Sequence, residues 1–113
     1  MVATHEDGTL VVQLMRWGTE MGLEDALSAI FDEGFEPEKV DMKNPAVKKV
    51  LFFGETMGTL VKHGLLDRAL LVDLLWIDGI WSRVGPSALA MRKHAGEARL
   101  YENLEALALA TGA

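Results

Sequence analysis

The sequence contains no cysteine, which excludes disulfide bonds, thiolate metal sites and a cysteine nucleophile. Proline is rare, with three residues, and no run alternates apolar and polar residues as a half-buried strand would. Serine occurs only at positions 28, 82 and 87, with neither a nucleophile-elbow motif nor a paired base, so no hydrolytic triad is expected. Alanine, leucine and methionine are abundant and favour helices, so we expect an all-α fold.

Basic residues are also few. The chain has 11 Lys and Arg against 17 Asp and Glu, a net charge of −6 that disfavours nonspecific nucleic-acid binding. Residues 1–41 hold ten acids and two bases, whereas the rest of the chain holds seven acids and nine bases. This polarity fits acidic helices packed on a more neutral core, or electrostatic pairing with a partner or a second subunit.

No hydrophobic run is long enough to cross a bilayer. The most apolar stretch, residues 69–81, is interrupted by Asp73 and Asp78 and is shorter than the roughly 20 residues that a membrane span needs. The first seven residues lack the basic and apolar regions of a signal peptide. We therefore expect a cytoplasmic protein with no membrane insertion.

A chain of 113 residues is the size of one domain, so we expect a single helical domain over 1–113, a compact bundle of five or six helices. Thr9 is the expected N-cap of the first helix, and Asn44 followed by Pro45 marks the start of the third. Gly85-Pro86 should kink a helix or start a new one. The expected ranges are about 9–21, 24–33 with Gly34 as its cap, 45–63, 87–95 and 97–110. After 45–63 we expect a fourth helix with Asp67 as its N-cap, which is apolar over 69–81 and should be the most buried element.

Gly54 and Gly58 lie one turn apart inside the third expected helix, where each costs roughly 1 kcal/mol relative to alanine. The close approach of another backbone is the expected reason, and a ligand against the bare helix is the alternative. The other face carries Phe52, Glu55 and Thr59, which are candidate interface residues. We expect the Glu55 carboxylate to be solvated.

The three tryptophans, Trp17, Trp76 and Trp81, are expected to pack in the core with the methionines, and lining an apolar pocket is the alternative. The three histidines form no recognised metal motif, so we expect neither a metal site nor a cofactor. A cluster of basic residues could bind an anion, but pairing with the acidic N-terminal half, within the chain or between subunits, is the favoured interpretation. Its members are Arg83, Arg92, Lys93, His94 and Arg99.

Several features of the second half occur together in one known family. They are residues 53–67 (FGETMGTLVKHGLLD), Trp81, Arg92 and residues 100–108 (LYENLEALA). In this respect the chain resembles a prokaryotic family of helical domains of unknown function, some of which are attached to membrane helices. The resemblance implies the helical fold and supplies no catalytic residue.

The same resemblance makes Trp81, Arg92, Tyr101 and Asn103 candidate ligand-binding residues. A purely structural role is the alternative, in which Tyr101 and Asn103 anchor the last helix and Arg92 pairs with Glu102 or Glu105.

Two functional hypotheses follow. The first is a noncatalytic protein-interaction module that binds another copy of itself as a homodimer, or another protein, through Phe52 and the opposed charges of its two halves. The second is a small-ligand sensor for an anion, or an unrecognised enzyme, with a pocket between the fourth and last helices. In that pocket Trp81, Arg92 and Tyr101 would hold the anionic group.

Overall fold

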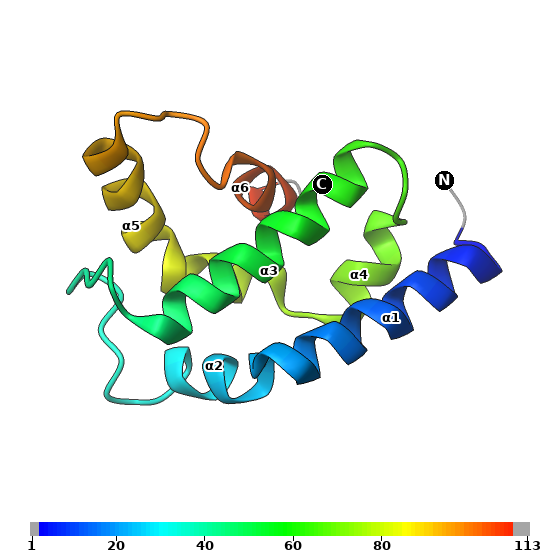
Figure 1. Cartoon of the computed structure of the whole chain (residues 1–113), viewed down its shortest axis with the longest axis horizontal. Helices are drawn as coiled ribbons and strands as arrows, with labels where there is room; N and C mark the ends of the chain where they lie inside the picture. Colours follow the sequence, from blue (N-terminus) through cyan, green and yellow to red (C-terminus); the bar gives the residue numbers. More distant parts are fainter. Residues whose placement is uncertain (1–2, 110–113) are drawn as a thin grey trace.

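The protein is all-helical over residues 3–109, the part of the chain that the computed structural model describes (Figure 1). This confirms the expected fold class. The six helices of this part are α1 (His5–Met21), α2 (Leu23–Ile30), α3 (Pro45–Lys62), α4 (Arg68–Leu74), α5 (Ile77–Ala95) and α6 (Glu102–Leu109). The expected end of the last helix, Ala110, lies outside the described residues.

The first helix begins earlier than expected, because its N-cap is Thr4 and not Thr9. Thr4 Oγ1 accepts a hydrogen bond from the amide of Asp7 (3.2 Å), and Asp7 Oδ2 accepts one from the amide of Thr4 (2.8 Å). This reciprocal capping box satisfies amides that would otherwise have no partner at the start of the helix. Asp7 Oδ1 also accepts from the amide of Asp67 (3.0 Å), which ties α1 to the start of α4.

Helix α3 begins as expected, with Asn44 Oδ1 accepting hydrogen bonds from the amides of Ala46 and Val47 and with Pro45 in the first turn. Helix α2 ends at Ile30, whereas the sequence predicted about Glu33 and a cap at Gly34. A side-chain turn replaces its last residues, because Asp32 Oδ2 accepts from the amide of Gly34 (2.9 Å).

The stretch 69–81 is not one continuous helix, contrary to the prediction. Leu75 is extended (φ −125°, ψ 143°) and separates α4 from α5. Leu71 and Ile80 are both buried, yet nine residues at 3.6 per turn would place them on opposite sides of a straight helix. The break lets both side chains reach the core.

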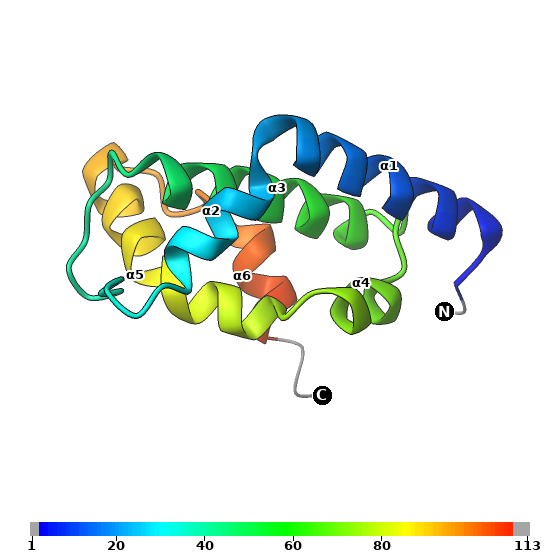
Figure 2. The same ribbon diagram turned by 90° about the horizontal axis from the view of Figure 1, so that it is seen from below.

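The predicted boundaries of α5 and of the last helix are confirmed only in part. Helix α5 continues through Gly85 and Pro86, so no new helix starts there, and Figure 2 shows the helix bending along its length. It ends at Gly96 in the left-handed conformation (φ +68°), as expected. The last helix starts at Glu102 and not near Glu97, because turns occupy the residues between.

The core is centred on α3, and not on the 69–81 stretch as predicted. Helix α3 lies across the middle of the molecule and packs against α2, α5 and α6 (Figures 1 and 2). Its fully buried side chains include Leu51, Phe53 and Met57, whereas Leu71 is the buried residue of α4. In residues 3–109 no helix has both the length and the apolar character that a bilayer span would require.

Helix α6 crosses α3 at the two glycines. A Cβ atom at Gly58 would lie 2.4 Å from the carbonyl oxygen of Asn103, which confirms the expected close approach of another backbone. At Gly54 a side chain fills the space instead, because a Cβ atom there would lie 2.8 Å from both Cδ atoms of Leu104. The bare surface of α3 is therefore filled by α6.

We expect Gly58→Ala to lower the free energy of unfolding by roughly 2 kcal/mol, since α6 must move for the methyl group to fit. Chemical denaturation with circular dichroism measures the change. Gly8→Ala is the matched control, because Gly8 is also helical but has no atom within 4 Å of an added Cβ. The control should gain roughly 0.5–1 kcal/mol. Equal effects of the two substitutions would contradict the close crossing.

The buried carboxylate of Asp7 should make stability depend on pH. The hydrogen bond from the backbone of Thr4, with further ones from its side chain and from the Asp67 backbone, lowers the pKa of Asp7 below its ordinary value of 3.8. Its contribution is therefore fully present above the unfolded pKa and is lost as pH falls through the folded pKa. The stability gap between the wild type and Asp7→Asn should be constant above about pH 5 and shrink in acid.

Equilibrium unfolding between neutral and acidic pH measures this gap, and Glu6→Gln is the control because Glu6 is exposed. A gap that stays the same at acidic pH would show that the Asp7 charge is not what the capping box uses.

Candidate functional site

Three of the candidate residues meet where α6 crosses α3. Glu55 Oε1 accepts hydrogen bonds from the amides of Asn103 and Leu104, both at 2.9 Å. Glu55 Oε2 accepts from the side-chain amide of Asn103 (2.9 Å), which also donates to Thr59 Oγ1 (3.1 Å). The expectation of a solvated Glu55 is therefore wrong, since both carboxylate oxygens bind α6.

Glu55 caps α6 from another helix. The first amides of a helix have no partner within it, and a serine, threonine, aspartate or asparagine just before the helix ordinarily supplies one. The residue in that position is Tyr101, whose side chain cannot do this. Glu55 provides the oxygen instead, and its negative charge lies at the favourable positive end of the helix dipole.

Tyr101 has the one positive φ angle of a non-glycine residue among those described, at +60°. The left-handed region is uncommon for a bulky side chain and costs roughly 1–2 kcal/mol. The chain thereby turns sharply into α6, which lets the next amides face Glu55. Burial, with the nearby negative charge of Glu55, raises the pKa of the Tyr101 phenol above its ordinary value of 10.0.

Arg92 joins the end of α5 to α6. Its Nε donates to the carbonyl oxygen of Leu100 (2.6 Å), and its Nη1 lies 3.0 Å from Glu105 Oε1. The structural alternative, in which Arg92 pairs with Glu105, is therefore confirmed. Its side chain is mostly buried, so this pair anchors the joint between the two helices.

A surface hollow of about 340 Å³ lies over Tyr101 and Asn103. Three carboxylates line it, from Glu55, Glu97 and Glu102, with one guanidinium from Arg99. This charge disfavours an anionic ligand. Neither Trp81 nor Arg92 lines the hollow, and the Trp81 ring instead covers Gly85, so the structure does not bring the four ligand candidates into one hollow here.

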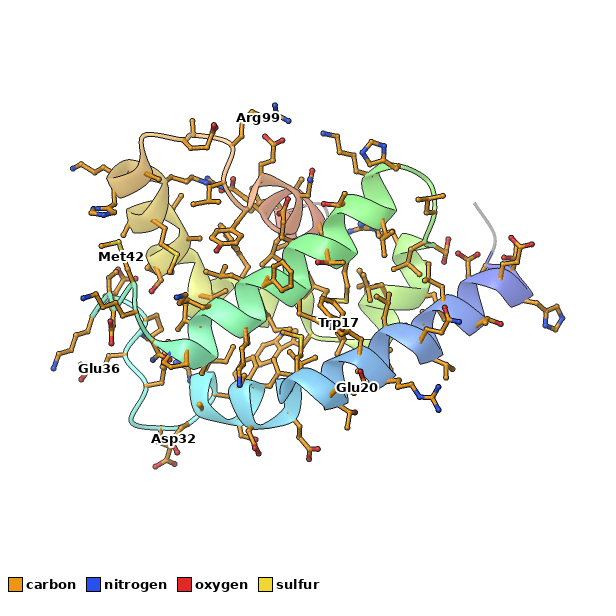
Figure 3. All side chains as sticks on the ribbon, viewed as in Figure 1. Trp17, Glu20, Asp32, Glu36, Met42 and Arg99 are labelled. Carbon is orange, nitrogen blue, oxygen red and sulfur yellow. The ribbon has the colours of Figure 1, made fainter. Side chains whose placement is uncertain are left out.

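Phe52 is exposed, with 58% of its surface accessible. Its ring meets Trp17 edge-on at 5.7 Å between centroids, and Trp17 stacks on Phe53 at 5.2 Å. Figure 3 shows Trp17 between α1 and α3. Trp17 therefore links the buried core to an aromatic ring on the surface, which is consistent with a contact surface at Phe52.

Trp76 does not lie in the core as expected but on the surface, with 67% of its area accessible. It stacks on Phe31 at 5.6 Å between ring centroids, and the Arg83 guanidinium lies 5.8 Å from the Phe31 and Phe35 ring centroids. We call Trp76, Phe31, Phe35 and Arg83 the Trp76 patch. The sequence signal that could have revealed it is Gly79, three residues after Trp76, where a Cβ atom would overlap the indole ring.

Within residues 3–109 the basic residues form no salt bridge with the acidic N-terminal half, so the expected internal pairing is wrong, whereas pairing between subunits stays a prediction. Arg99 Nη2 lies 3.0 Å from Glu102 Oε1, and the three salt bridges among residues 3–109 all use Glu102 or Glu105. In Figure 3, Glu20, Asp32 and Glu36 lie along one edge of the molecule and Arg99 at the opposite edge. The acids of residues 3–41 are therefore not neutralised by ion pairs within the described chain.

These contacts define a small helical domain whose partly buried polar groups hold its last helix and whose Phe52 and Trp76 rings are exposed. The chain belongs to the family described as Domain of unknown function (DUF4760), whose model matches residues 9–111. No curated protein and no solved structure matches the chain. The match confirms the resemblance to a family of domains of unknown function, and it supplies no activity. In residues 3–109 no cluster of three or more His, Asp or Glu is placed to hold a metal ion.

We expect Glu55→Ala to lower the free energy of unfolding by about 2–3 kcal/mol, because three donors on α6 lose a charged acceptor. Glu55→Gln keeps one carbonyl oxygen and should lose less. The matched control is Glu20→Ala, which removes an exposed glutamate from another helix. Urea denaturation measures all three, and a loss equal to that of the control would contradict the capping role of Glu55.

Proposed function

We propose that this domain is a noncatalytic, cytoplasmic protein-interaction module that forms a homodimer through the Trp76 patch. The observation that carries the proposal is an exposed tryptophan held in one position. A free side chain must lose rotamer freedom on binding, whereas an ordered ring has already lost it. Tryptophan is also among the residues that contribute most to the binding energy of interfaces.

The surroundings of Trp76 order its ring. Phe31 stacks on it with an interplanar angle of 11°, and Gly79 leaves room on the first turn of α5. A glycine inside a helix is unfavourable by roughly 1 kcal/mol, so its place here is explained by the ring that it accommodates. If the Trp76 ring lay in the core, its burial would offset the cost of Gly79, but Trp76 remains mostly exposed.

A second copy is the partner that fits the charges around the patch. A two-fold interface places the same surface on both sides, so the charges of the two copies can attract each other when that surface carries both signs. The patch contains the Arg83 guanidinium, and the adjoining turn after α2 carries exposed Asp32 and Glu33. Arg83 of each copy could then face the acids of the other.

Phe52, which is not part of the Trp76 patch, also supports a role in protein contacts. It is exposed and in contact with Trp17, whereas its neighbours Glu55 and Thr59 use their polar groups to bind α6. Of the three interface candidates from the sequence, Phe52 is therefore the one whose side chain is most available to a partner.

Size-exclusion chromatography with light scattering, over a dilution series, tests the proposal. We expect a dimer of about twice the 12.4 kDa chain mass. Trp76→Ala should weaken it by roughly 2 kcal/mol or more, about thirtyfold in Kd. Gly79→Ala should weaken it too, by displacing the ring while keeping the indole. Leu65→Ala is the control, since it removes another exposed apolar side chain from the α3–α4 joint.

A monomer at every concentration would overturn the homodimer. A dimer weakened by Phe52→Ala but unaffected by Trp76→Ala would overturn the choice of the Trp76 patch and place the interface on α3.

A further inference from the structure

An open cavity of about 440 Å³ lies between the C-terminal half of α3, the start of α4 and α6. This volume is within the range of roughly 300–1,000 Å³ typical of small-molecule sites. The wall includes apolar Val61, Ala106 and Leu107 and charged Lys62, Arg68 and Glu102. It shares no residue with the Trp76 patch, and it adjoins the hollow over Tyr101 at Glu102 and Asn103.

Arg68 is the unusual member of this wall. Its Nε and Nη2 atoms are buried and have no hydrogen-bond partner, and Arg68 takes part in none of the salt bridges. Leaving a charged group buried without a partner is costly, and native structures ordinarily provide one. The Nε and Nη2 atoms have almost no accessible surface, so Nη1 is the nitrogen of this guanidinium left for a ligand in the open cavity, and it can donate a charge-assisted hydrogen bond to a carboxylate.

The other charged groups leave the cavity positive. Glu102 Oε1 already receives the Nε and Nη2 of Arg99, at 3.1 and 3.0 Å, and lies 4.0 Å from the Nζ of Lys62. The Glu102 carboxylate is therefore shared between Arg99 and Lys62. Lys62 is half exposed at the rim and adds a second positive charge beside Arg68.

The rest of the cavity wall determines what kind of body an anionic ligand should carry. The cavity wall is mainly apolar, with Val61, Ala106 and Leu107 among its lining residues. A ligand that only carried charge would leave this surface in water, whereas an apolar body would cover it. We propose that the cavity binds a small organic acid with an apolar body, whose carboxylate pairs with Arg68.

Titration of the full chain with octanoate, followed by ¹H–¹⁵N NMR, tests the site. We expect the shifts to concentrate at the amides of Val61, Lys62, Ala106 and Leu107. Arg68→Met should weaken octanoate binding by at least roughly tenfold, the scale of one charge-assisted hydrogen bond. Lys93→Met is the matched control, because Lys93 is an exposed cation on α5, and it should bind like the wild type.

Thermal unfolding separates a binding role of Arg68 from a structural one. Because the substitution removes an unpartnered buried charge, Arg68→Met should be at least as stable as the wild type. Octanoate should raise the melting temperature of the wild type and not that of the variant. If the variant fails to fold, Ala106→Trp fills the cavity while keeping Arg68, and it should abolish the shifts.

Three results would overturn the proposal. They are an absence of shifts at millimolar octanoate, octanoate binding that Arg68→Met leaves unchanged, and binding of neutral 1-octanol as tight as that of octanoate. Inorganic phosphate that binds as tightly as octanoate would overturn the choice of an apolar acid. The oligomeric state does not enter these measurements, so the outcome is independent of the proposed homodimer.

Discussion

The crossing of α6 over α3 is the contact on which the rest of the structure depends. Helix α6 has eight residues, too few to be stable alone, so its position must come from packing and polar contacts. Gly58 lets its backbone approach, and Glu55 binds its first amides. Steric fit and electrostatics thus act at the same point.

Other features follow from this crossing. Because α6 is fixed against α3, Arg92 can join it to the end of α5 through Glu105, and Leu104 can fill the surface at Gly54. The same placement leaves a space where α3, α4 and α6 do not meet, and Arg68 lines it. The cavity is therefore a consequence of how the short helices are held, while the Trp76 patch depends on α2 and α5.

Local signals in the sequence predicted the parts of the fold that local chemistry decides. The Asn44-Pro45 start, the Gly96 cap and the close approach at Gly58 are of this kind. The break at Leu75 has no glycine or proline to mark it and arises because two buried faces must both reach the core. The solvation of Glu55 and the burial of Trp76 were mispredicted for a similar reason, since both depend on residues distant in sequence.

The sequence identified Asn103 and Arg92 as important but could not distinguish a ligand contact from an anchor, because both use the same donors.

Amide hydrogen exchange tests the central contact most directly. The amides of Asn103 and Leu104 lie in the first turn of α6, and amides in such a turn ordinarily exchange fast. Because both donate to Glu55, we predict that they exchange much more slowly than the amides of Glu24 and Asp25. Those two amides lie in the first turn of α2, which has no side-chain cap. Exchange as fast as in α2 would contradict the account.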